Sequence, residues 1–138
     1  MEHYCAISRP AILLGLLVLT ISACRLEPKS VGHETRVGWR PIASFSGNGP
    51  SQTESFNIES GQWRIKWAAT NEKAPGAGIL RVTVHSAVSG RPMTVAVDHK
   101  GIGHDVSYIN EDPRLYHLVI ESSDIDWSLA IEEAVVGY

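Results

Sequence analysis

Two histidines that each lie beside an aspartate are the side chains of this sequence best suited to chemistry. They occur in Asp98-His99-Lys100-Gly101-Ile102-Gly103-His104-Asp105, where four residues separate the two imidazoles. If the glycines permit a hairpin, both rings lie on the core-side face of neighbouring strands, with Cβ atoms about 4.5–5.5 Å apart. The sequence therefore predicts that His99 and His104 could share one zinc or copper ion.

The number of ligands favours a simpler interpretation of this pair. A zinc site uses three or four ligands from the protein, and only two are adjacent here. A third would have to come from another segment, with His85, His117 or Asp98 as candidates, and the sequence places none of them nearby. The alternative is a pair of rim histidines, each hydrogen-bonded and partly exposed, which needs no cofactor.

Other catalytic signatures are missing from the sequence. There is no Gly-x-Ser-x-Gly nucleophile elbow, and Gly47-Asn48-Gly49 is typical of a hairpin turn rather than a dinucleotide loop. The carboxylates of Glu111-Asp112, and those of Asp124 and Asp126, occur in turns without the full oxygen shell that calcium needs. The net charge is −3, with no run of basic residues, which argues against a nucleic-acid partner. We predict no catalytic residue.

Cys24 has the most specific chemistry in the chain. It follows an apolar run, Ala11–Ile21, that is shorter than the ~20 residues of a membrane-spanning helix and has the length of a signal-peptide core. The segment Ile21-Ser22-Ala23-Cys24 resembles the bacterial lipobox. The resemblance implies cleavage before Cys24 and attachment of lipid to its thiol, which anchors the chain to a membrane. The other cysteine, Cys5, would be removed with the signal peptide, so no internal disulfide is expected.

The chain is expected to have three parts. Residues 1–23 form the signal peptide, residues 24–38 the lipidated cysteine and a flexible tether, and residues 39–138 a single domain. The tether lacks hydrophobic periodicity and, as a coil of about 14 residues, spans roughly 20 Å. Arg25 follows the cysteine instead of the aspartate that resembles the inner-membrane retention signal of enteric bacteria. We therefore expect a location in the bacterial cell envelope, with the outer membrane favoured where one exists.

From Trp39 onward, apolar residues alternate with polar ones, which is the pattern of half-buried strands. The clearest strand has four apolar residues on one face: Trp63, Ile65, Trp67 and Ala69. Its other face is basic, with Arg64 and Lys66. The other predicted strands contain Ile42 to Phe45, Phe56 and Ile58, Leu80 to Val84, Val95 and Val97, Val106 and Tyr108, Tyr116 to Ile120, and Trp127 to Ile131. About eight short strands predict an all-β fold, an antiparallel β-sandwich with a jelly roll or a small barrel as variants.

A pattern of turn glycines and aromatic residues supports this fold. It consists of Phe45-Ser46-Gly47, Thr53, Phe56, the segment 61–67 and Trp127. The pattern is similar to one that recurs in small uncharacterised β-sandwich domains of bacterial secreted proteins and lipoproteins. Because every element is a turn glycine or a core aromatic, the resemblance implies the fold and no activity. Trp39, at the junction with the tether, is compatible with either a core or a surface position.

These observations favour a membrane-anchored lipoprotein with a non-enzymatic binding or structural role in the cell envelope. Its partners would be the membrane, through the lipid on Cys24, and an envelope protein or ligand. One alternative is a metal-binding protein or metal-dependent hydrolase that uses His99 and His104. Another is an inhibitor of a cell-wall hydrolase, a class whose known members generally carry cysteine pairs that this sequence lacks.

Overall fold

The computed structural model describes Gly32 and residues 35–137. The predicted signal peptide, the lipobox with Cys24 and most of the predicted tether lie outside these residues. The chain divides into two units, Met1–Gly32 and His33–Tyr138, and every strand described below belongs to the second. The described residues form no helix, and therefore no apolar helix of membrane-spanning length.

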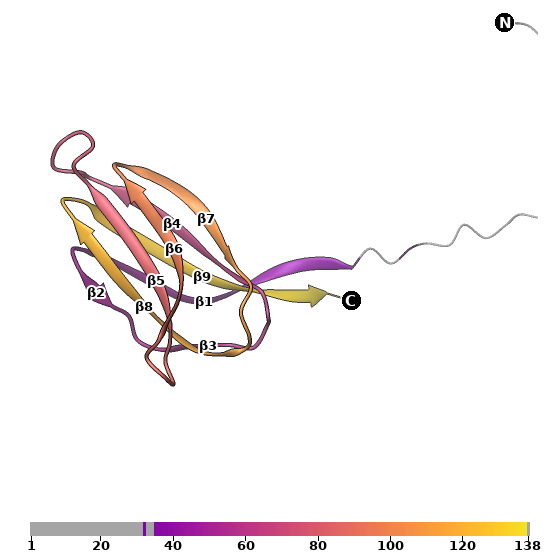
Figure 1. Ribbon diagram of the computed structural model, residues 1–138. Coiled ribbons are helices and arrows are strands. Elements are labelled where there is room, and N and C mark those ends of the chain that lie inside the picture. Colours follow the sequence, from indigo (N-terminus) through magenta and orange to yellow (C-terminus); the bar gives the residue numbers. More distant parts are fainter. Residues whose placement is uncertain (1–31, 33–34, 138) are drawn as a thin grey trace, which may run out of the picture. The chain divides into compact units, whose positions relative to one another are not determined.

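Nine strands form two antiparallel sheets that pack face to face (Figure 1). The strands are β1 (Arg36–Asn48), β2 (Ser51–Gln52), β3 (Phe56–Ile58), β4 (Trp63–Thr70), β5 (Ile79–Ser86), β6 (Pro92–Lys100), β7 (Gly103–Ile109), β8 (Arg114–Ser123) and β9 (Asp126–Gly137). Sheet A has the order β1-β9-β4-β7, and sheet B has the order β2-β8-β5-β6, with β3 also paired to β8. The predicted fold class, an all-β antiparallel sandwich, is confirmed.

The strand order is that of a jelly roll, one of the two predicted variants. Strands β2 and β3 both pair with β8 and together act as one interrupted strand. The pairing is then nested, because β1 pairs with β9, β2 and β3 with β8, β4 with β7, and β5 with β6. Such nesting rolls one long hairpin into two packed sheets. The chain consequently changes sheet at every connection except β2–β3 and β5–β6.

The core lies between the two sheets and is built from alternate residues of each strand. The predicted inward residues of β4 are all buried: Trp63, Ile65, Trp67 and Ala69. The predicted inward residues of β5 and β8 in sheet B are buried as well: Leu80, Val82, Val84, Tyr116, Leu118 and Ile120. Full burial of one large apolar side chain stabilises the fold by ~1.5–3 kcal/mol relative to exposure. The two inner faces therefore hold the sandwich together.

Strand β1 begins at Arg36, earlier than the predicted domain boundary at Trp39. Arg36, Val37 and Gly38, predicted as the end of the tether, pair with residues 135–137 of β9. Their hydrogen-bond partners come from the other end of the sequence, so no local pattern signals this strand. Figure 1 shows the start of β1 and the end of β9 projecting together beyond the sheets.

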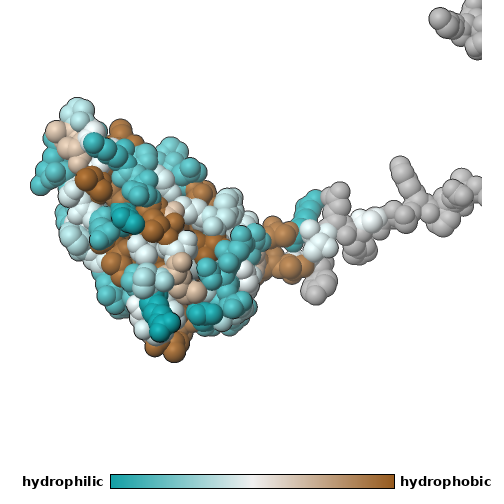
Figure 2. Space-filling model, viewed as in Figure 1, coloured by the Kyte–Doolittle hydropathy of each residue, from teal (hydrophilic) through white to brown (hydrophobic). Residues whose placement is uncertain are grey.

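Three apolar or aromatic positions predicted to face the core face outward instead. Val95 is 44% exposed, because a register shift pairs Val82 with Val97 but the next residue, Thr83, with Val95. Such a bulge turns the side chains that follow it to the other face. Val106 pairs with Lys66, and Tyr108, which is 57% exposed, pairs with Arg64, so both lie on the outer face of sheet A. Hydrophobic and hydrophilic residues accordingly mix on the surface seen in Figure 2.

Candidate functional site

The two histidines of the predicted metal site are not brought together. His99 lies in β6 opposite the buried Leu80, and its ring packs on that of Trp67, with the ring centroids 4.9 Å apart. His104 lies in β7 opposite Ala68 and is exposed on the outer face of sheet A. The expectation that both rings face the core is wrong for His104. The reason is the register of β7, since His104 pairs with Ala68 on the outward side of β4.

The interior position of His99 depends on the turn between β6 and β7. Its Nε2 atom lies 3.1 Å from the carbonyl oxygen of Ile102. A Cβ atom added at Gly103 would lie 2.6 Å from the same Nε2, closer than real Cβ atoms approach. The glycine therefore allows the backbone to pass beside the ring, and the hydrogen bond occupies that nitrogen. His99 therefore matches the alternative given above, in which each histidine is hydrogen-bonded and partly exposed.

The remaining candidate metal ligands are dispersed. Within residues 35–137, no group of three or more His, Cys, Asp or Glu residues is placed to hold an ion. Asp98 lies opposite Arg81 on β5 and is exposed. The turn carboxylates have other partners, since Asp126 accepts a hydrogen bond of 2.9 Å from Asn71 and Asp124 lies 3.5 Å from the Lys73 ammonium. His85 and His117, however, lie opposite each other on sheet B.

A broad surface feature lies on the outer face of sheet A. Register places two rows of outward residues across all four strands of the sheet. One row is Ser44, Ala130, Lys66 and Val106, and the next is Ser46, Ser128, Ala68 and His104. Five of these eight side chains are serine or alanine, so the middle of the sheet lacks bulky groups. The result is a depression of about 730 Å³, which we call the sheet A groove.

A cluster of larger side chains lies beside the sheet A groove. The guanidinium carbon of Arg64 is 4.1 Å from the centre of the Trp39 ring, a cation–π contact. The rings of Trp39 and Tyr108 are 5.8 Å apart. Arg64 also donates a hydrogen bond of 2.6 Å to Glu132. The sequence did not decide whether Trp39 lies in the core or on the surface. It lies on the surface, where these contacts hold its ring in one orientation.

Several kinds of polar group line the sheet A groove. Its polar groups are serine hydroxyls, the Lys66 ammonium, the His104 imidazole and the Asp105 carboxylate. One pairing of a nucleophile with a base on this face is Ser128 with His104, and β4 separates their strands. Two strand spacings amount to roughly 9–10 Å, beyond the reach of the hydrogen bond that would activate the hydroxyl. The prediction of no catalytic residue remains a prediction.

The sequence did not predict the sheet A groove, although it singled out His104 and Lys66, because the lining residues come from four separate strands. Serine and alanine at outward positions carry no motif, and only their register makes them neighbours. The sequence correctly predicted that Arg64 and Lys66 of β4 point outward, and this alternation was a usable signal for the outer face of sheet A. Extending that phase to β1 and β9 would have found Ser44, Ser128 and Ala130.

Comparison with known proteins finds no matching family model, no similar curated protein and no similar solved structure. The predicted relationship to lipoprotein sandwich domains therefore stays a prediction.

Proposed function

We propose that this chain is a lipid-anchored protein of the bacterial cell envelope whose jelly-roll domain binds a ligand in the sheet A groove. The observation that carries the proposal is the groove itself, which extends across all four strands of sheet A. The anchor rests on the sequence Ile21-Ser22-Ala23-Cys24, which lies outside the described residues. Together they describe a non-enzymatic binding protein held at a membrane.

The lining of the sheet A groove favours a flat ligand that is rich in hydroxyl groups. Small side chains at Ala68, Ser128 and Ala130 let a flat ligand approach the backbone of the sheet. Hydroxyls and a charged group can orient such a ligand through a few hydrogen bonds, as in most small-molecule sites. The neighbouring ring of Tyr108 offers an apolar surface to the carbon face of a sugar. We therefore propose the glycan of the cell wall as the ligand.

Cosedimentation with purified peptidoglycan sacculi tests this proposal. The full chain, solubilised in detergent, should pellet with the sacculi in a saturable manner. Ser128→Arg places a long charged side chain on the floor of the groove without touching the core, because Ser128 is exposed. We expect it to weaken binding at least about tenfold, which corresponds to ~1.4 kcal/mol. Val95→Arg is the matched control, since it adds the same side chain at an exposed position of sheet B.

Two results would contradict the proposal in different ways. If the wild-type chain stays in the supernatant at every concentration, the cell-wall glycan is not the ligand. If Ser128→Arg pellets as well as the wild type, the ligand binds elsewhere and the sheet A groove is not the site.

A further inference from the structure

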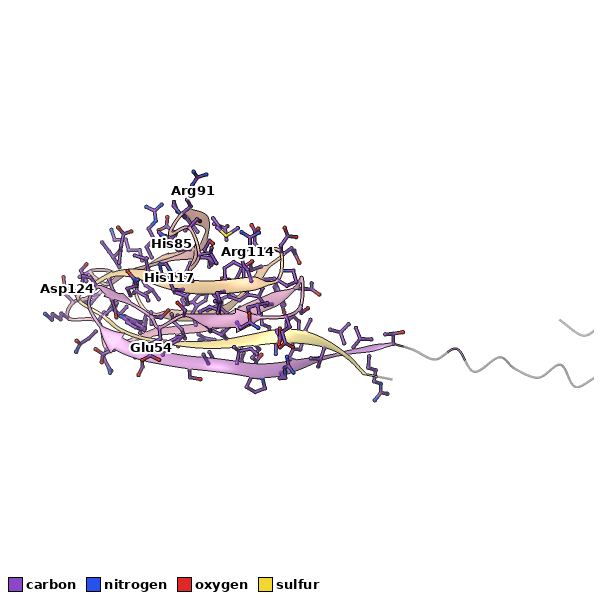
Figure 3. The ribbon with its side chains drawn as sticks, turned by 90° about the horizontal axis from the view of Figure 1, so that it is seen from below. Glu54, His85, Arg91, Arg114, His117 and Asp124 are labelled. Carbon is purple, nitrogen blue, oxygen red and sulfur yellow. The ribbon has the colours of Figure 1, made fainter. Side chains whose placement is uncertain are left out.

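A second pair of histidines lies on the outer face of sheet B. His85 of β5 and His117 of β8 are directly opposite each other in the antiparallel register. Their ring centroids are 5.2 Å apart and the ring planes differ by 29°, so the imidazoles are stacked. Figure 3 shows both side chains on the same layer of the sandwich. Neither residue belongs to the sheet A groove.

A backbone hydrogen bond fixes the orientation of the His85 ring. Its Nδ1 atom lies 3.0 Å from the carbonyl oxygen of Gly90, in the turn between β5 and β6. A carbonyl oxygen only accepts hydrogen bonds, so Nδ1 carries the proton and donates it. The lone pair is then on Nε2, which points away from the backbone. Histidines that bind metals are commonly held in this way, by a hydrogen bond from the second ring nitrogen.

The turn that supplies this acceptor is itself well defined. Gly90 has a φ of 73°, a conformation that suits glycine and strains other residues. Its N–H donates a hydrogen bond of 2.8 Å to the carbonyl oxygen of Ser86. The carbonyl of Gly90 is therefore fixed beside His85.

We propose that His85 and His117 form a two-imidazole binding site for a borderline divalent cation such as zinc, nickel or copper. A tetrahedral zinc ion with nitrogens at about 2.0–2.1 Å needs them roughly 3.3 Å apart. Directly opposite residues have Cβ atoms about 4.5–5.5 Å apart, and the two ring centroids are 5.2 Å apart. Binding of one ion by both rings therefore requires the stacked rings to tilt toward a common point. Water fills the other positions, because the described residues supply no third side chain.

The affinity order among metals follows from the ligand type. Two imidazoles favour copper(II) over nickel and zinc, and all three over magnesium or calcium, which prefer oxygen ligands. With only two protein ligands the site should bind more weakly than a structural zinc site and exchange its ion readily. Lowering the pH should release the ion, because protons compete for the same lone pairs.

Titration of the histidine ring signals with zinc tests the site. The full chain would be prepared without a histidine tag and kept in a detergent that does not bind metals. Zinc should shift the ring signals of His85 and His117 in a saturable way that a chelator reverses. His99 and His104 should keep their signals. The measurement uses zinc alone, so its outcome does not depend on the ligand proposed for sheet A.

Variants decide whether the pair acts together. His117→Ala and the more conservative His117→Gln should each lower zinc affinity at least about tenfold, because a single imidazole is left. His104→Ala is the matched control, an exposed histidine removed from the other sheet, and should bind zinc like the wild type. An unchanged affinity in both His117 variants, shifts confined to other histidines, or no saturation at millimolar zinc would each overturn the proposal.

Discussion

Glu133 of β9 and Arg40 of β1 form an ion pair between directly opposite residues of sheet A. The Glu133 side chain points inward and is only 1% exposed, whereas that of Arg40 is 50% exposed. The Arg40 Nε atom donates to one carboxylate oxygen at 3.1 Å. The backbone N–H groups of Glu59 and Ser60 donate to the other oxygen at 2.8 and 3.0 Å. A buried carboxylate thus connects β1 and β9 with the turn before β4.

Substitution of Glu133 by glutamine should destabilise the domain. One donor among Arg40 and the two backbone N–H groups would then face an amide NH2 instead of an acceptor. Hydrogen bonds to a charged group contribute about 1.5–3 kcal/mol each, and we expect a loss of that size in the free energy of unfolding. Urea denaturation of the full chain in detergent measures it. Glu59→Gln is the control, since this partner of Arg40 is 69% exposed and should change stability little; equal losses in both would contradict the prediction.

The same carboxylate should make stability depend on pH. Burial alone would raise the pKa of Glu133, but the hydrogen bonds from Arg40, Glu59 and Ser60 outweigh it and the pKa lies below its usual value of 4.5. The unfolded chain therefore takes up the proton first as the pH falls. The stabilising contribution is complete above about pH 4.5 and is lost as the pH falls through the lower pKa of the folded state. The difference in unfolding free energy between wild type and Glu133→Gln should shrink from pH 7 to pH 3, and a constant difference would refute this.

Trp67 should be essential for the stability of the core. Its side chain is 9% exposed and packs against His99. Removal of a buried tryptophan side chain typically costs about 3–5 kcal/mol, because it leaves a cavity. Trp67→Ala should therefore strongly lower the urea concentration at the midpoint of unfolding. The fluorescence of the other tryptophans monitors the unfolding. Trp39→Ala, on the outer face of sheet A, is the control and should lower it less. An unchanged midpoint for Trp67→Ala would refute the prediction.

Anchoring should depend on a single thiol. We expect Cys24→Ala to abolish incorporation of a labelled fatty acid and to leave the precursor uncleaved, because in the proposed lipoprotein the diacylglycerol attaches to that sulfur. Metabolic labelling of cells followed by membrane fractionation tests this. Cys5→Ala is the control, because this residue precedes the cleavage site and its loss should leave labelling intact. Full labelling of the Cys24 variant would rule out the lipid anchor.

The sequence by itself determined the fold class and most of the core. Alternation within one strand is a local property, since successive side chains point to opposite faces whatever the strand pairs with. The inward phases of β4, β5, β8 and β9 could therefore be read correctly from residues such as Trp63, Val82, Leu118 and Leu129. The alternation within one strand does not reveal a bulge, which is why Val95 was assigned to the wrong face.

Only the tertiary structure decided which strands are neighbours, and with that the candidate sites. His99 and His104 are close in sequence, yet the half-buried ring of His99 packs on Trp67, while the register of β7 with β4 leaves His104 exposed on the outer face of sheet A. His85 and His117 are distant in sequence, yet the register of β5 and β8 places them opposite each other. Strand pairing depends on the summed burial and hydrogen bonding of whole sheets. No short segment of the sequence contains that information, and the sheet A groove and the two-histidine site both follow from it.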